Sequence, residues 1–197
     1  MLDLDIQQLL RSADVSQINF QMAGLTVNGQ GYRQVSDCLS DRPMRHRLRV
    51  TVNPAIVGHQ ALASYDPEDD KLNVRSSDIL GTPQGRAQVV HECTHAQCDL
   101  RRRSSAILDE EGAAFVAEGW YLLAIGEDIS DPVFNLSTNV QQIVRDVYRR
   151  AQQASAGQQV RIIGQQRNNL RGFMRRGYGY GSGHYRSDGI RGQRFRP

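Results

Sequence analysis

Two long stretches with few helix breakers follow each other in the middle of this 197-residue chain. The first begins at Thr82-Pro83, a hydroxyl cap followed by the residue that suits the first position of a helix. We therefore expect a helix from residue 83 to about residue 98. The second stretch, Ala106–Ala124, is so crowded with apolar residues that we expect a largely buried helix. Each helix must pack an apolar face against other elements, so the pair constrains the fold strongly.

The second helix is bounded by residues that start and stop helices. Ser104 or Ser105 is the candidate N-terminal cap, and Gly126 is the expected stop. A further helix is expected over residues 138–154, where an apolar stripe lies opposite arginine and glutamine. Two shorter helices are expected, at residues 2–11 and 33–39.

Three short strands are expected ahead of the helix pair. Residues 46–53 alternate apolar and polar side chains with the two-residue period of a half-buried strand. Ala61–Tyr65 and Lys71–Arg75 flank a charged connector and are expected to form a hairpin. The glycine- and asparagine-rich residues 24–31 are expected to interrupt regular structure. These segments predict an α+β fold, with a small mixed or antiparallel sheet in front of the helix pair and the 138–154 helix behind it.

Composition excludes several classes of protein. Apolar residues make up 39% of the chain and charged residues 23%, unlike a disordered, collagen-like or coiled-coil protein. No apolar run approaches the roughly 20 residues of a membrane-spanning helix, so no membrane insertion is expected. The start, Met1–Asp5, is acidic where a secretory signal would be basic, and three cysteines are an odd number that suits a reducing compartment. We expect a cytoplasmic protein, or one exported without a standard signal peptide.

Charge is distributed unevenly along the chain. The net charge is +3, yet residues 171–197 hold seven arginines against Asp188 and so carry +6. The same segment is rich in glycine and tyrosine, a composition that disfavours a fixed fold. We therefore expect one folded domain over residues 1–170 and a flexible tail over residues 171–197.

The first long helix contains His91-Glu92-Cys93-Thr94-His95, which is the pattern H-E-x-x-H. Four helical residues turn about 400° and rise about 6 Å, so both histidines project from one face and can hold one ion. Glu92 lies beside the ion without binding it. In a catalytic zinc site with three protein ligands and a water, such a carboxylate can take a proton from the water. Zinc is therefore the expected cofactor and Glu92 the candidate catalytic base.

The two helices together resemble the gluzincin branch of the zincin metallopeptidases. In that branch the H-E-x-x-H helix is followed by a second helix whose glutamate completes the zinc site, often in an E-E-x-A-A-aromatic-like stretch. Residues 110–115 read E-E-G-A-A-F here. The resemblance covers roughly residues 61–124 and implies a small zincin-like domain. It also implies that the Leu72–Val74 strand is the edge strand beside the active-site helix and binds substrate backbone.

The resemblance implies that Glu111 is the third metal ligand beside His91 and His95. Glu110 is the second choice and Glu118 the third. Glu118 lies seven residues beyond Glu111 on much the same helix face, so it can instead hold the other nitrogen of a ligand histidine. For Glu110, a solvated helix face is the more ordinary interpretation.

Two features set this chain apart from known zincins. Residues 96–100 lack the third histidine and the glycine with which metzincins continue, and this excludes that branch. Phe115 stands where the most studied gluzincins carry an aspartate, four residues after the ligand glutamate. The groups around the zinc ligands are therefore expected to differ from those of such gluzincins.

Zincins usually add a tyrosine, histidine or arginine that stabilises the oxyanion. The candidates here are Tyr121, Tyr148 and His184. Tyr148 shares the apolar stripe of its helix, where packing in the core is the more ordinary role. His184 lies in the glycine-rich tail, where contact with solvent is the more ordinary role.

The favoured function is a zinc-dependent metallopeptidase that hydrolyses a protein or peptide substrate. The alternative is a module that binds nucleic acid or an acidic partner through the basic tail. In that alternative the arginines attract phosphates and bases stack on Tyr178, Tyr180 and Tyr185.

Overall fold

The computed structural model describes residues 1–39, 48–57, 61–101, 105–155, 157–177 and 184–185. Its helices are α1 Leu2–Leu10, α2 Ala13–Ser16, α3 Gly29–Cys38, α4 Pro83–Leu100, α5 Ile107–Ala124, α6 Thr138–Gln153 and α7 Gly164–Gly177. Its strands are β1 Asn19–Met22, β2 Leu25–Asn28, β3 Arg49–Val52, β4 Ala63–Asp66, β5 Lys71–Val74, β6 Ser105–Ala106, β7 Val160–Ile162 and β8 His184–Tyr185. The fold is a mixed α+β fold with small sheets, as the sequence predicts.

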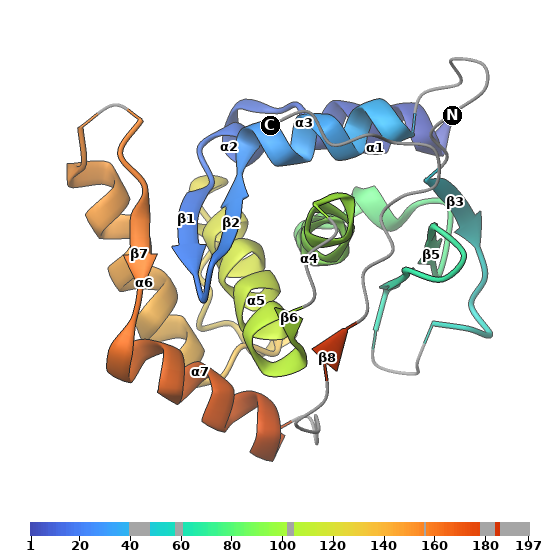
Figure 1. The fold of residues 1–197 in the computed structure, drawn as a ribbon. Helices are drawn as coiled ribbons and strands as arrows, with labels where there is room; N and C mark the ends of the chain where they lie inside the picture. Colours follow the sequence, from blue (N-terminus) through green and yellow to red (C-terminus); the bar gives the residue numbers. More distant parts are fainter. Residues whose placement is uncertain (40–47, 58–60, 102–104, 156, 178–183, 186–197) are drawn as a thin grey trace.

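Helix α4 runs through the centre of the molecule and packs most extensively on α5 (Figure 1). It begins as predicted, with Pro83 in its first turn and the Thr82 hydroxyl accepting a bond from the Gly85 amide at 3.0 Å. The apolar residues around its H-E-x-x-H pattern are buried, so they fix the rotation of the helix about its axis. The two histidines consequently face α5.

Helix α5 is almost entirely buried, as its composition predicts. Its start differs from the prediction, because the N-cap position is Ala106, which makes no side-chain cap bond. Ser105 instead lies in β6 and its hydroxyl bonds to Glu110, while Ser104 lies outside the described residues. The helix ends at Ala124, and two residues later Gly126, with a φ of 85°, forms the left-handed stop that the sequence predicts.

One three-stranded sheet has the order β3-β5-β4. Strands β4 and β5 form the predicted antiparallel hairpin, and β3 pairs with β5 in parallel. The prediction that Leu72–Val74 is the edge strand is therefore wrong, because β5 lies in the middle. The edge strand that packs against α4 is β4.

The second sheet has the order β2-β1-β7 and shows that residues 24–31 do not interrupt regular structure. Ala23 and Gly24 adopt positive φ and form the turn between β1 and β2, and Asn28 caps α3 through the Gly31 amide. A Cβ atom on Gly29 would lie 2.6 Å from the Ser16 carbonyl oxygen. The glycine is thus required by close packing at the start of a helix.

The predicted domain boundary at residue 170 falls inside α7. Leu170 and Met174 are fully buried, and α7 packs on α5 and α6. Residues 171–177 therefore belong to the folded domain, because they complete an apolar helix face that begins before the basic segment. Of the remaining tail, the described part is β8, which pairs with β6.

As predicted, α6 packs behind the helix pair on α5. The described helices include none long and apolar enough to span a membrane.

Candidate metal centre

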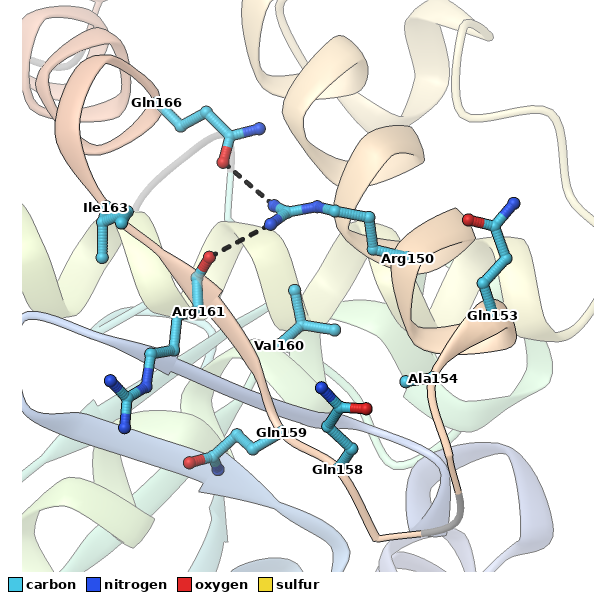
Figure 2. Close-up of a pocket in the computed structure, with 9 residues that line it drawn as sticks. All are labelled: Arg150, Gln153, Ala154, Gln158, Gln159, Val160, Arg161, Ile163 and Gln166. Carbon is cyan, nitrogen blue, oxygen red and sulfur yellow. Dashed lines mark hydrogen bonds between the residues drawn. The ribbon is translucent and has the colours of Figure 1, made fainter.

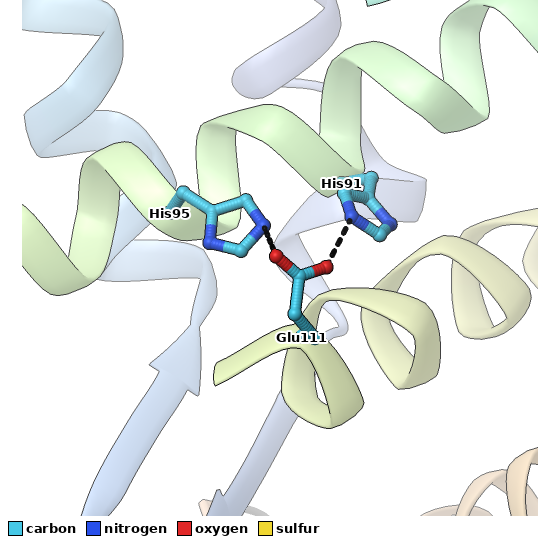
Figure 3. A group of neighbouring side chains, drawn as sticks. All are labelled: His91, His95 and Glu111. Atoms are coloured by element: carbon cyan, nitrogen blue, oxygen red, sulfur yellow. Dashed lines mark ion pairs between the residues drawn. The ribbon is translucent and has the colours of Figure 1, made fainter. Parts of the chain in front are cut away.

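His91 and His95 on α4 converge with Glu111 from the first turns of α5 (Figure 3). The two Nε2 atoms each lie 3.7 Å from a different oxygen of the Glu111 carboxylate. One ligand atom from each side chain lies within 4.8 Å of the others, and all three residues are buried. The structure thus brings together the three residues that the sequence indicates as metal ligands.

The remaining nitrogen of each imidazole is held by another glutamate of α5. His91 Nδ1 lies 2.9 Å from Glu118 Oε2, and His95 Nδ1 lies 3.0 Å from Glu110 Oε1. With each Nδ1–H donating to one of these carboxylates, each Nε2 is directed at Glu111 and can coordinate a metal ion when it carries no proton. A carboxylate that holds the far nitrogen of a histidine is the usual neighbour of a protein metal ligand.

These contacts settle where the two other glutamates lie. Glu118 contacts the Nδ1 atom of His91, as one of its two predicted roles requires. The interpretation of Glu110 as a solvated residue is wrong, because Glu110 is only 5% exposed and also bonds to the Ser105 hydroxyl. Sequence reasoning missed this role because Ser105 and His95 meet Glu110 only when β6 and α4 are packed against α5.

Glu92 points toward the edge strand. Its Oε2 accepts a hydrogen bond from the Tyr65 amide of β4 at 2.8 Å, and the residue stays partly exposed. The Tyr65 hydroxyl in turn donates to Asp99 Oδ2, two turns further along α4, at 2.7 Å. Glu92 is thus held at one oxygen, and its carboxyl group lies close enough to both histidines to feel their charge. Neither Tyr65 nor Asp99 carries a sequence signal for this role, because β4 and α4 meet only in the fold.

The electrostatics of the centre favour a positive ion. Burial lowers the pKa of His91, but the carboxylates of Glu111 and Glu118 outweigh it and raise that pKa well above its usual value. The pKa of His95 is raised in the same way, against burial, by Glu111 and Glu110. Burial raises the pKa of Glu92, although the neighbouring histidines oppose this. Four carboxylates around two imidazoles leave a negative charge that a divalent cation would offset.

The donor set suits a transition metal. Two imidazole nitrogens and one carboxylate oxygen form a ligand set that zinc takes in catalytic sites, with a fourth position left for water or substrate. Ligand atoms about 2.0–2.2 Å from one ion at near-tetrahedral angles lie about 3.3–3.6 Å apart. The two nitrogen–oxygen separations of 3.7 Å are close to this range. The buried His-His-Glu group can therefore hold a metal ion.

The predicted oxyanion-stabilising residues are not brought to the centre by any described contact. Tyr121 accepts a bond from Arg86 at 3.1 Å, and the ring of Tyr148 packs edge-on against Trp120 with centroids 5.7 Å apart. Tyr148 thus has the core role that its position on the stripe indicates. The backbone of His184 pairs with Ala106, one residue before α5, and its side chain lies outside the described part.

Comparison with known proteins adds no family to this description. No protein-family model matches the chain, and neither a curated protein nor a solved structure matches it. The resemblance to gluzincins therefore stays a prediction, and the geometry of the centre is the basis for assigning a function.

Proposed function

We propose that this chain is a zinc-dependent metallopeptidase with a zincin-like arrangement of its active site. The observation that carries the proposal is the convergence of His91, His95 and Glu111. In addition, the Nδ1 atom of each histidine contacts another glutamate of α5. The arrangement is what a metal ion needs from its ligands and their neighbours.

Each residue has a distinct role in this proposal. His91, His95 and Glu111 bind the zinc. When bound there, zinc acidifies a water molecule and polarises a substrate carbonyl. Glu92 Oε1 accepts the proton of the attacking water and can deliver it to the leaving amine, while the Tyr65 amide keeps Oε2 in place. The raised pKa of Glu92 brings it closer to neutral pH, which suits a group that both takes and gives a proton.

The edge strand supports a peptide as the substrate. In the hairpin with β5, the amide of Tyr65 points outward to Glu92, so the alternating geometry of a strand directs the main chain of Ala63 outward as well. An extended peptide can pair with such an edge by main-chain hydrogen bonds. Strand β4 would then place a scissile bond beside Glu92.

The first test measures zinc. The full chain, purified without a metal-binding tag, is expected to contain about one zinc per chain by elemental mass spectrometry. His95→Ala and Glu111→Ala are expected to lose the metal while keeping the wild-type circular dichroism spectrum, and Glu127→Ala, a carboxylate just beyond α5, is the matched control. A folded wild-type chain that stays metal-free after zinc is supplied would overturn the proposal.

The second test measures hydrolysis. Wild-type protein is screened against a library of quenched fluorescent peptides, beside Glu92→Gln. Glu92→Gln is expected to retain zinc and to lose about 10²- to 10⁴-fold in rate, because general acid–base catalysis contributes that much. Equal rates for the two proteins would remove Glu92 from the mechanism.

A further inference from the structure

The part of the chain that holds α6, β7 and α7 is strongly basic. Residues 138–177 contain eight arginines and a single aspartate: three arginines on α6, one on β7 and four on α7. Residues 1–137 contain 12 basic and 19 acidic residues, so positive charge is segregated into this unit. Because α6 contacts both β7 and α7, we call the surface they form the α6–β7–α7 face.

Ion pairs neutralise only part of this charge. Five of the eight arginines pair with three aspartates, which are Asp109, Asp128 and Asp146. The eight arginines of these three elements exceed the three aspartates by five charges. Arg161, Arg175 and Arg176 are exposed, and the side chain of Arg149 is 68% exposed despite its pair. Such a density of exposed guanidinium groups is the electrostatic pattern of a surface that binds a polyanion.

A groove of about 780 Å³ lies within this face, between the end of α6, β7 and the start of α7 (Figure 2). Arg150 joins its walls by donating to the Arg161 carbonyl at 3.3 Å and to Gln166 Oε1 at 3.0 Å. Gln153, Gln158 and the side chain of Arg161 also line it. Amide and guanidinium groups are side chains that contact phosphate and sugar oxygens, so the polar part of the groove, beside apolar Val160 and Ile163, suits an anionic ligand.

The composition of the face favours a nucleic acid over an acidic protein as the partner. Interfaces between proteins are centred on buried aromatic or apolar anchors. Among the described residues of the face, the large apolar side chain that is strongly exposed is Ile163, at 69%. Contacts to a phosphate backbone need no such anchor. We propose that the α6–β7–α7 face, with its groove, binds the sugar–phosphate backbone of a nucleic acid without regard to sequence.

The test compares two variants with equal net charge. Fluorescence anisotropy of a labelled 20-base-pair DNA duplex and a 20-nucleotide RNA is measured with the full chain at several salt concentrations. Arg161→Gln/Arg175→Gln is expected to weaken binding at least tenfold. It is also expected to reduce the slope of log K against log salt by about 2 for the duplex, because each lost phosphate contact contributes about 0.9. Arg33→Gln/Arg49→Gln removes two exposed arginines of α3 and β3 and is expected to bind like wild type.

Further measurements distinguish binding at the α6–β7–α7 face from binding elsewhere on the chain. A variant with Arg186, Arg191, Arg194 and Arg196 changed to glutamine is expected to keep most of the affinity. The proposal is overturned if this tail variant loses binding while Arg161→Gln/Arg175→Gln does not. It is also overturned if Arg161→Gln/Arg175→Gln and Arg33→Gln/Arg49→Gln lose the same amount of affinity. Equal binding of poly-L-glutamate would refute the assignment to nucleic acid, and so would no binding of either nucleic acid at 50 mM salt. None of these results depends on zinc or on hydrolysis.

Discussion

Replacing Glu118 is expected to weaken zinc binding in a graded way. Its Oε2 lies 2.9 Å from His91 Nδ1 in a buried setting, so its charge orients the imidazole and strengthens its Nε2 as a ligand. A hydrogen bond to a charged group is worth about 1.5–3 kcal/mol, which corresponds to a factor of about 10 to 150 in Kd. Glu118→Gln keeps an acceptor oxygen, so we expect about tenfold weaker binding. Glu118→Ala removes the bond and is expected to cost about a hundredfold.

The assay is a competition titration against a chromogenic zinc chelator at pH 7, with thermal unfolding recorded for every variant. Glu127→Gln is the matched control, since it removes a carboxylate just beyond the same helix and should leave the Kd unchanged. Glu110→Gln is expected to behave like Glu118→Gln, because Glu110 lies 3.0 Å from His95 Nδ1. Folded Glu118 variants with the wild-type Kd, within about twofold, would refute this account of how the histidines are held.

Three further predictions follow from other contacts. Without zinc, the raised pKa of His91 stabilises the fold below its ordinary pKa of 6.5, and Tm is expected to fall as pH rises through the higher folded-state pKa. Excess zinc should abolish that fall. Gly85→Ala would place a Cβ 1.9 Å from a backbone carbonyl and is expected to destabilise the chain by about 1–3 kcal/mol or more in urea unfolding. Gly81→Ala meets nothing within 4 Å and should be neutral. Tyr65→Phe removes the 2.7 Å hydrogen bond to Asp99 and is expected to slow peptide hydrolysis several-fold at constant zinc content. An unchanged rate would mean that this hydrogen bond is not needed to position β4.

The helices could be predicted from sequence because their signals are local. Helix α4 runs 83–100 against the expected 83–98, and α5 runs 107–124 against 106–124. Caps, stops and a 3.6-residue period act within one or two turns, so each segment carries its own evidence. The same reason explains the common direction of His91 and His95, since two histidines four residues apart share a helix face whatever the rest of the chain does.

The errors concern contacts between distant segments. Residues 24–31 carry glycines because Gly24 adopts a positive φ in a turn and α3 begins in close contact with other elements, and glycine content alone does not distinguish these causes from an irregular loop. A central strand cannot be distinguished from an edge strand until the pairing of all strands is known. The prediction that β5 is the edge strand is wrong for this reason, because β3 also pairs with it. The glycine-, tyrosine- and arginine-rich composition predicts a boundary at residue 170, whereas the buried face of α7 continues through Met174.

The sequence by itself determined the α+β class, the long helices, and the face from which His91 and His95 project. All of these depend on spacing along one segment. Only the tertiary structure decided that Glu118 and Glu110 hold the two histidines and that Tyr65 holds Glu92. These contacts join residues 15 to 27 positions apart in the chain, and they form only when α5 and β4 pack against α4. Helical geometry thus set the common face of the two histidines, and the packing of one element on another set the positions of the glutamates that contact them.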